Sequence, residues 1–284
     1  MCINDLVVLQ LNILIVLVLY KKKLNEVPFL IDAFNVNHEV DIYIHDNSPD
    51  PQVMPFVNGL IYFHDSKNTG VSHAYNCGFE IAKHKGKECV LLLDQDTNFK
   101  INDLIVYEKA YMMYSHAFIY APMICDQKKE KIYSPAFLRS YVGHSKPYSN
   151  VHVAQPFLLD GHSVINSGLM IPLTIFEMIG GYNENIKLDF SDVYFLEKYK
   201  EKHNQLILLP LELIHSLSGD EGYNKTRELH RFKFYCEGAV FLGLSLRKST
   251  AWTVLRRMLR LLFKYHTLQP VFIFFDFYLL RKNT

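Results

Sequence analysis

The chain has 284 residues, of which 49% are hydrophobic and 14% aromatic, and its formal net charge is +1. This composition excludes an intrinsically disordered chain, because it supplies enough apolar residues for a sizeable core. The near-zero charge gives no field that would steer the chain to nucleic acid, so we expect no nucleic-acid partner. Five cysteines without a C-x-x-C pair favour neither a disulfide framework nor a zinc knuckle, and they indicate a reducing, cytosolic setting.

The first apolar run, "LVVLQLNILIVLVLY" over residues 6–20, is shorter than the roughly 20 residues that span a bilayer. Gln10 and Asn12 interrupt it, and neither a preceding basic residue nor a following small-residue cleavage site indicates a signal peptide. We predict a buried strand over residues 13–20. A membrane anchor is the alternative interpretation.

The first half of the chain alternates between strand and helix patterns. Helices are predicted over 25–35, with Asn25 as cap and Pro28 in the first turn, and over 71–86. Strands are predicted over 40–48, 60–65 and 89–96. This alternation predicts an α/β fold, Rossmann-like, with a mostly parallel central sheet flanked by helices. Ligands bind beyond the carboxyl ends of such strands, where Tyr20, Asp46, Asn47, Asn68, Asp94 and Asp96 follow.

The second half is less regular. Strands are predicted over 118–124, 167–172 and 205–215, with an irregular polar and aromatic region over 127–160. Helices are predicted before Gly180 and over 191–202, where Ser191 is the expected cap. The tail is mostly helical. We therefore expect a domain over 1–226 and a helical C-terminal extension over 227–284.

The segment "LLLDQDT" ends an apolar strand on Asp94 and Asp96. On an extended strand, residues two apart point to the same side, about 6.6 Å apart. Two carboxylates without imidazole or thiolate suit Mg²⁺ or Mn²⁺, which share a few protein oxygens with substrate phosphates. The alternative is a pair of aspartates that cap a turn and face solvent.

A second group lies in "KNTGVSHAYNCGFEIA", where Asn68, Gly70 and Asn76 accompany the start of a helix. Small residues allow a ligand to approach the backbone closely, and a helix N-terminus favours phosphate. Capping and close packing are the alternative explanation. The basic run "YKKKLNE" that follows the first strand is typical of a solvated loop, and a phosphate-facing role is the lesser alternative.

In chain order, "IYIHDNS", "NTGVSHAYNCGFEIA", "LLLDQDT", "INSGLMIP" and "GGYNENIKLDFSDV" resemble the family 2 glycosyltransferases with the GT-A fold. The resemblance is to their rhamnosyltransferase-like branch and runs from about residue 13 to 220. It implies transfer of a sugar from a nucleotide-sugar donor, with rhamnose as the first expectation, to a saccharide or lipid-linked acceptor.

The resemblance also implies roles for individual residues. Asp46, with Asn47 and the Tyr20 region, contacts the nucleotide; Asp94 and Asp96 hold the metal, ribose and diphosphate. The segment Asn166, Ser167 and Gly168 shapes the floor of the donor and acceptor site, and His215 approaches the metal. An interior histidine with no metal role is an equal alternative for His215.

A carboxylate must take the proton of the acceptor hydroxyl, and a single base with direct displacement inverts the anomeric carbon. Asp192 is the expected base and Asp189 the second candidate, although a helix N-terminal charge also explains Asp192. The branch often has D-x-E here, whereas this chain has Tyr194 at the glutamate position. That departure puts the acceptor contact in doubt.

The tail segment "TVLRRMLRLLFKYH" places Arg256, Arg260 and Lys264 on one helical stripe. It is typical of an amphipathic helix at an anionic membrane, although packing against the catalytic domain explains it as well. We expect a cytoplasmic enzyme, peripheral at the inner face of the cell membrane.

The sequence also bears on two other functions. A nucleotidyltransferase needs a glycine-rich loop after the first strand, and "LYKKKLNEVP" has no glycine. A catalytically inactive sugar-binding or scaffold subunit of a polysaccharide assembly complex is the alternative from another class. The presence of both a D-x-D pair and a candidate base disfavours it, while Tyr194 keeps it open.

Overall fold

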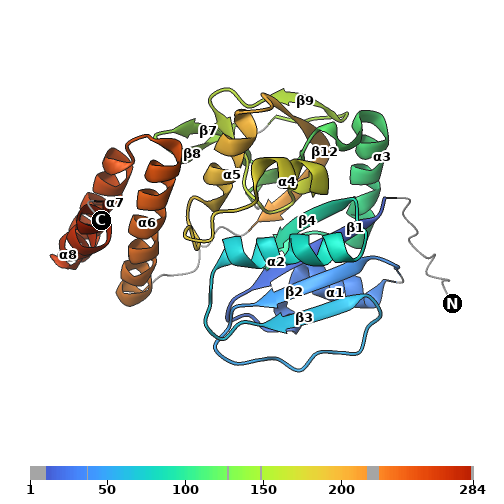
Figure 1. The fold of residues 1–284 in the computed structure, drawn as a ribbon, viewed down its shortest axis with the longest axis horizontal. Coiled ribbons are helices and arrows are strands. Elements are labelled where there is room, and N and C mark those ends of the chain that lie inside the picture. The colour runs from blue at the N-terminus through green and yellow to red at the C-terminus, as the bar shows by residue number, and fades with distance from the viewer. Residues whose placement is uncertain (1–10, 37, 127, 148, 216–223, 283–284) are drawn as a thin grey trace.

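The computed structural model describes residues 11–36, 38–126, 128–147, 149–215 and 224–282 (Figure 1). Within these residues a single sheet of 12 strands runs in the order β10-β7-β6-β11-β4-β1-β2-β3, with β5, β8, β9 and β12 attached beside it. Helices cover both faces of the sheet, and a separate group of helices lies at one end of the molecule. The fold is α/β, as the alternation of patterns predicted.

Four neighbouring strands at one end of this order are parallel: β1 (Ile13–Leu19), β2 (Asp41–Asp46), β3 (Leu60–His64) and β4 (Cys89–Asp94). All seven residues of β1 are buried, since helices cover both of its faces. Leu14, Val16 and Val18 enter one apolar cluster, and Ile13, Ile15, Leu17 and Leu19 enter the other. The strand predicted over residues 13–20 is confirmed.

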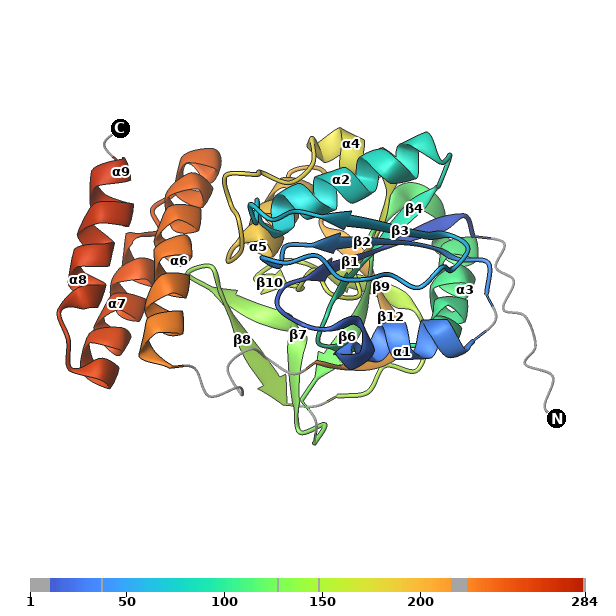
Figure 2. The same cartoon turned by 90° about the horizontal axis from the view of Figure 1, so that it is seen from below.

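One face of the sheet carries α2 (Val71–His84), α4 (Leu173–Ile179) and α5 (Ser191–Lys200). The other carries α1 (Pro28–Asn35) and α3 (Leu104–Tyr114) (Figure 2). Helix α2 lies very close to β1, because a Cβ at Gly78 would stand 2.4 Å from Val16 Cγ2. Gly78 therefore serves close packing of this helix on the sheet.

Beyond β4 the sheet becomes mixed. Strand β11 (Met170–Pro172) is antiparallel to both β4 and β6 (Tyr120–Cys125), and β6 is antiparallel to β7 (Lys131–Arg139). The remaining strands are β5 (Thr97–Asn98), β8 (Val142–Pro147), β9 (Gln155–Leu158), β10 (His162–Ser163) and β12 (Gln205–His215). The region 127–160, predicted to be irregular, thus contains strands. Strand β8 alternates between half-buried and exposed residues, so no apolar run marks it in the sequence.

The helix starts differ in detail from the prediction. Asn25 lies in a 3-10 turn (Leu24–Glu26), and α1 begins at Pro28 after Val27, which offers no side-chain cap. Ser191 is the first residue of α5, whose cap is Phe190 in a left-handed conformation with φ +75°. Further 3-10 turns are Ile101–Asp103 and Ser115–Ala117.

The C-terminal helices are α6 (Lys225–Leu246), α7 (Ala251–Tyr265), α8 (Gln269–Phe274), a π-helical turn (Phe275–Leu279) and α9 (Leu280–Lys282). They form a third apolar cluster together with Ile186, Phe190 and Val193 from the region around the start of α5. Residues of the predicted extension therefore pack on the segment that carries the candidate base. Across the described ranges, no helix has both the length and the apolar character needed to cross a membrane.

Candidate active site

The carboxyl ends of the parallel strands meet at one edge of the sheet. Leu19 pairs in register with Asp46, and Val18 pairs with Asp94. Tyr20, Asp46 and Asp94 are therefore neighbours at the edge where such sheets bind ligands. The structure brings together the polar strand ends that the sequence singled out.

Asp46 is fully buried, and its carboxylate accepts hydrogen bonds from Ser48, Gln52 and Tyr62. The donors are Ser48 N at 2.9 Å, Gln52 Nε2 at 3.1 Å and Tyr62 Oη at 2.9 Å. Burial raises the pKa of Asp46, but these hydrogen bonds outweigh it and hold the pKa below its ordinary value. Asp46 is therefore an ionised acceptor that fixes the 48–52 loop beside β1.

Asn47 is buried beside it, and its side-chain oxygen has no hydrogen-bond partner among the described residues. Its backbone N–H donates to Leu19 O at 2.9 Å, which holds the residue at the strand end. A buried acceptor without a partner is uncommon, and a ligand donor is one remedy. The N–H of a base or a ribose hydroxyl has the required chemistry.

The two aspartates of "LLLDQDT" lie on different kinds of backbone. Strand β4 ends at Asp94, and Gln95 and Asp96 form a turn, so the strand predicted to residue 96 is too long by two residues. The side chains of Asp94 and Asp96 therefore do not lie on one extended strand, where they would point the same way. Gln95 Oε1 instead accepts from Tyr20 N at 2.8 Å and joins the turn to the end of β1.

The turn carries an ion pair that the sequence argument did not assign. Lys22 Nζ lies 2.6 Å from Asp96 Oδ1 and donates to Gln95 O at 3.2 Å. Its signal in the sequence was the basic run after the first strand. Asp94 Oδ1 accepts from Tyr75 Oη at 3.3 Å, and Asp94 N donates to Ser167 Oγ at 3.0 Å.

A divalent ion fits this edge only in part. Asp94 and Asp96 offer hard oxygen ligands, and Mg²⁺ or Mn²⁺ takes most of its other ligands from phosphates and water. Within the described ranges no group of three or more His, Cys, Asp and Glu side chains is placed to hold a metal. His215 ends β12 in register with Thr97, and its side chain lies outside the described residues.

The segment Asn166–Gly168 connects the two sides of the site. Ser167 Oγ lies 2.5 Å from Thr97 Oγ1, and Gly168 N donates to Leu92 O at 2.7 Å. Asn166 Oδ1 accepts from Tyr182 Oη at 2.8 Å, and its Nδ2 donates to Ser191 Oγ at 3.2 Å. The segment thus joins the end of β4 to the start of α5, next to Asp192.

Asp189 and Asp192, the two candidate bases, have opposite surroundings. Asp189 pairs with Arg231 at 3.2 Å and Arg257 at 3.5 Å; burial raises its pKa, but the two guanidinium groups outweigh that and lower it. No lysine, arginine or histidine of the described ranges pairs with Asp192. Burial first, and then the charges of Asp189 and Asp94, raise the pKa of Asp192 to about 6, although Val193 N donates to it at 2.7 Å.

A general base needs a pKa near the working pH and a free lone pair. Asp192 meets both conditions, whereas Asp189 is neutralised by two arginines. The chemistry therefore favours Asp192.

The start of α2 faces the chain itself. Val71 N donates to Lys187 O at 2.8 Å, and a Cβ at Gly70 would stand 2.5 Å from the same oxygen. Asn76 uses its amide on Tyr182 N, Tyr182 O and Glu184 Oε1. Gly70 and Asn76, which were predicted to contact the donor, hold the 182–187 segment against α2. Asn68 lies before them with φ +48° and donates its N–H to Asp65 O.

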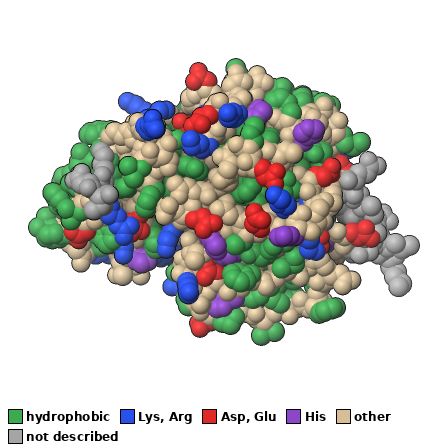
Figure 3. Space-filling model, viewed as in Figure 1, with side chains coloured by type: hydrophobic (Ala, Val, Ile, Leu, Met, Phe, Trp, Pro, Cys, Tyr) green, Lys and Arg blue, Asp and Glu red, His purple; other side chains and the backbone are tan. Residues whose placement is uncertain are grey.

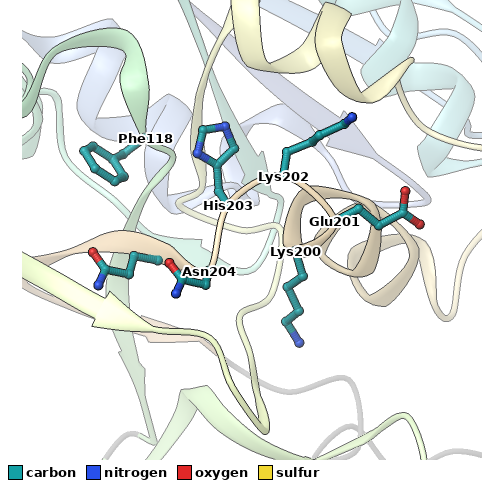
Figure 4. A pocket seen from close by; sticks show the side chains of 7 residues that line it. Phe118, Lys200, Glu201, Lys202, His203 and Asn204 are labelled. Carbon is teal, nitrogen blue, oxygen red and sulfur yellow. The ribbon is translucent and has the colours of Figure 1, made fainter.

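A cavity of about 280 Å³ lies elsewhere, at the end of α5 and the start of β12 (Figure 4). Its lining residues are Phe118, Lys200, Glu201, Lys202, His203, Asn204 and Gln205. Strand β12 runs parallel to β6, and its first residues lie at the edge opposite the strand carboxyl ends. We place the site at the carboxyl ends, because the buried charges and the unpartnered Asn47 oxygen are there.

Comparison with known proteins gives one sequence relative and several structures. No family model matches the chain. A dTDP-rhamnosyl transferase of Shigella flexneri, RfbF, is 28% identical over 129 residues, which cover 44% of this chain and 41% of that protein. The alignment thus spans less than half the length of either protein.

Solved structures of S. aureus TarS superpose on most of the chain. TarS 1–349 gives a TM-score of 0.55 at 12% identity and covers 90% of this chain and 72% of that one. The chain has the GT-A fold. The complex of TarS 1–349 with UDP gives a TM-score of 0.55 at 11% identity and covers 84% of this chain and 66% of that one. The complex with UDP-GlcNAc gives a TM-score of 0.53 at 12% identity and covers 90% of this chain and 73% of that one. Sequence and fold together confirm the resemblance of this GT-A chain to family 2 glycosyltransferases.

Proposed function

We propose that the chain is an inverting glycosyltransferase that moves a sugar from a nucleotide-diphosphate donor to a saccharide or lipid-linked acceptor in cell-surface polysaccharide synthesis. The observation that carries the proposal is the partly buried Asp192, unpaired with any cation in the described ranges, beside the Asp94 strand end. dTDP-rhamnose is the first donor to test, because the sequence relative is named a dTDP-rhamnosyl transferase. UDP-GlcNAc is the second, because TarS was solved with it.

In the proposed reaction, the acceptor hydroxyl oxygen attacks the anomeric carbon as its proton passes to Asp192. The bond from that carbon to the diphosphate breaks, and the diphosphate leaves with the electron pair. One base and one displacement invert the anomeric centre. Asp192 is mostly ionised at neutral pH, because its pKa of about 6 lies below that pH.

The leaving diphosphate needs positive charge beside it. Asp94 and Asp96 would hold Mg²⁺ or Mn²⁺, which stabilises the charge that grows on the diphosphate. Lys22 offers a second cation, since its ammonium already lies against Asp96 and has a flexible stem. Asn47 and Asp46 would serve the nucleoside at the end of β2.

The proposal is tested by donor binding and turnover on the full chain. We expect one nucleotide sugar to bind in the presence of Mn²⁺ by calorimetry and to release its nucleoside diphosphate slowly to water. Asp96→Asn should weaken that binding by about 10-fold or more. Asp160→Asn, an exposed carboxylate between β9 and β10, is the matched control and should bind as the parent does.

If no nucleotide sugar binds with or without metal, the transferase proposal is wrong and an inactive scaffold subunit takes its place. Binding without any turnover, even with acceptor saccharides supplied, also favours the inactive sugar-binding subunit. Binding that is unchanged in Asp96→Asn would remove the metal and diphosphate roles from this turn.

We also propose that the chain works peripherally at the inner face of the membrane, through the outer stripe of α7. Trp252, Leu259 and Phe263 are 65%, 36% and 69% exposed, and at 100° per residue they fall on one side of the helix. Arg256 is exposed on the same stripe, and Arg260 lies next to it. Figure 3 shows hydrophobic side chains at the left end of the molecule, where the C-terminal helices lie.

Apolar side chains with interspersed arginines suit the headgroup region of an anionic leaflet. The opposite face of α7, with Val254, Met258 and Leu261, is buried against the other helices. A membrane surface at this place would bring a lipid-linked acceptor to the same end of the molecule as α6 and Asp189.

Trp252 is the only tryptophan of the chain, so its fluorescence reports on this stripe directly. We expect a blue shift with vesicles that contain anionic lipid, a smaller one with zwitterionic vesicles, and none in Phe263→Asp with Leu259→Asp. A shift that depends on protein concentration and not on lipid would assign the stripe to self-association and overturn the membrane proposal.

A further inference from the structure

Asp189 lies three residues before the candidate base and is held by the C-terminal helices. Arg231, from α6, places Nη2 3.2 Å from Asp189 Oδ1 and Nε 3.5 Å from Oδ2. Arg257, from α7, places Nη1 3.5 Å from the same Oδ1. The carboxylate is 14% exposed, so these charge pairs are screened less than surface pairs.

The packing around the ion pairs is close. The guanidinium of Arg257 lies 4.0 Å from the centroid of the Tyr235 ring, and the ring of Phe190 lies 4.5 Å from Tyr235. Helix α6 nearly touches the backbone at this point, since a Cβ at Gly238 would stand 2.8 Å from Asp189 O. The segment before α5 is therefore held through both its side chains and its main chain.

Asp192 itself is held indirectly. Asp192 Oδ1 accepts a hydrogen bond from the backbone N–H of Val193, the next residue, and the hydroxyl of its neighbour Ser191 accepts one from Asn166 Nδ2. The two anchors of the base are thus the Asn166 contact on the sheet side and the Asp189 contacts on the helix side. Phe190 joins them through a left-handed backbone turn, φ +75°, which a small displacement of Asp189 would disturb.

We infer that Arg257, together with Arg231, is a positioning residue for the base Asp192, and that α6 and α7 are a structural part of the active site. The inference rests on the proposed function of Asp192. It deepens that function, because it makes the helical extension a condition for catalysis and not only a contact for acceptor or membrane.

Electrostatics adds to the geometry. The titratable groups that face Asp192 are Asp94 from β4, Tyr75 from α2, Tyr182 from the segment before α5, and Asp189. Two like charges close together oppose each other's ionisation. The arginines compensate the charge of Asp189, so the base remains ionised next to it at neutral pH.

The test compares Arg257→Ala, Arg257→Lys and Arg281→Ala in the full chain. Arg281 also forms an ion pair in the C-terminal helices, with Glu237 at 3.0 Å, so its loss removes a like charge from the same helices. The first measurement is the rate at which dTDP-rhamnose and UDP-GlcNAc are hydrolysed, detected by the nucleoside diphosphate that is released. The second is the affinity for each donor, measured by calorimetry.

Arg257→Ala should lower kcat by about 10-fold or more, because a misplaced base loses its reaction geometry. Donor affinity should stay within about 2-fold, since the donor edge is built on the strands. Arg257→Lys should recover part of kcat, and Arg281→Ala should behave as the parent. The acidic limb of the pH–rate profile follows the pKa of Asp192. It should move to higher pH in Arg257→Ala, because a positive charge near the base is lost, and to lower pH in Asp189→Asn, because a negative charge is lost.

Equal kcat in Arg257→Ala and the parent would overturn the inference, as would a matching loss in Arg281→Ala or a proportional loss of donor affinity. A parent that turns over neither donor counts against the proposed function instead, and not against the anchoring of the base. In that case hydrogen exchange still decides the anchoring: faster exchange over residues 186–193 in Arg257→Ala, but not in Arg281→Ala, supports it, and unchanged exchange overturns it.

Discussion

The two sides of the site are built in different ways. The donor side, with Asp46, Asn47 and Asp94, lies on consecutive parallel strands whose register alone brings these residues together. The base side, Asp189 and Asp192, lies on an irregular segment held by Asn166 and by arginines from distant helices. The donor side therefore depends on local strand order, and the base side depends on long-range packing.

The largest expected effect separates these two sides directly. Asp192→Asn should lower kcat by about 10²- to 10⁴-fold, because the acceptor hydroxyl loses its base, while donor affinity stays unchanged. Steady-state hydrolysis and calorimetry on the same preparation measure both quantities. Asp189→Asn is the companion variant; if it lowered kcat more than Asp192→Asn, the roles of the two carboxylates would be reversed.

The pH dependence should belong to the base side alone. The pKa of Asp192 is raised to about 6, chiefly by burial, and the base acts only when ionised. kcat should therefore fall about tenfold per unit as the pH drops below about 6 and level off above it. Donor affinity, measured over the same pH range, should not fall together with kcat. An acidic limb near the ordinary pKa of an aspartate would remove Asp192 from the base role.

The donor side should be sensitive to close packing under its strands. In Gly78→Ala the new Cβ would stand 2.4 Å from Val16 Cγ2, so α2 must move off β1, at a cost of about 1–3 kcal/mol in the free energy of unfolding. Urea unfolding measures this change. Val16→Ala removes the clashing methyl groups, and the double variant should be more stable than the sum of the single effects predicts. Additive effects would show that α2 and β1 are not in this contact.

The same contrast explains what the sequence could predict. The pattern of apolar runs was enough for the central strands, for α2 and for the GT-A resemblance, because burial on both faces leaves continuous runs such as "ILIVLVL". Asp192 was chosen over Asp189 by motif alone, and the structure adds the reason, since Asp189 is paired with Arg231 and Arg257.

Contacts between distant segments were not predictable. Asn76 and Gly70 were predicted as ligand contacts, and the structure adds partners over 100 residues away, because Asn76 bonds to Tyr182 and Gly70 packs against Lys187. Arg257 stands in the tail segment predicted to be an amphipathic helix, but periodicity does not reveal its partner Asp189 in another element. Strand β8 and the turn at Gln95 were missed for the related reason that neither has an apolar pattern of its own.

The smallest expected effect concerns the cation that lies against Asp96 on the donor side. The Lys22 ammonium lies 2.6 Å from Asp96, and both side chains are 23% exposed, so a divalent ion must compete with it. Lys22→Gln should therefore raise the affinity of the ligand-free chain for Mn²⁺ by about 3- to 10-fold, measured by calorimetric titration. Lys21→Gln is the matched control. It removes the same charge, but the Lys21 ammonium lies 5.2 Å from the centroid of the Tyr20 ring and not against Asp96.

With the donor bound, the effect of Lys22→Gln should change sign. Lys22 is then free to contact a phosphate, so its loss should weaken donor binding. An equal gain in both variants would reduce the effect to net charge, and a fall in Mn²⁺ affinity would show that Lys22 orders the turn for the metal instead of competing with it.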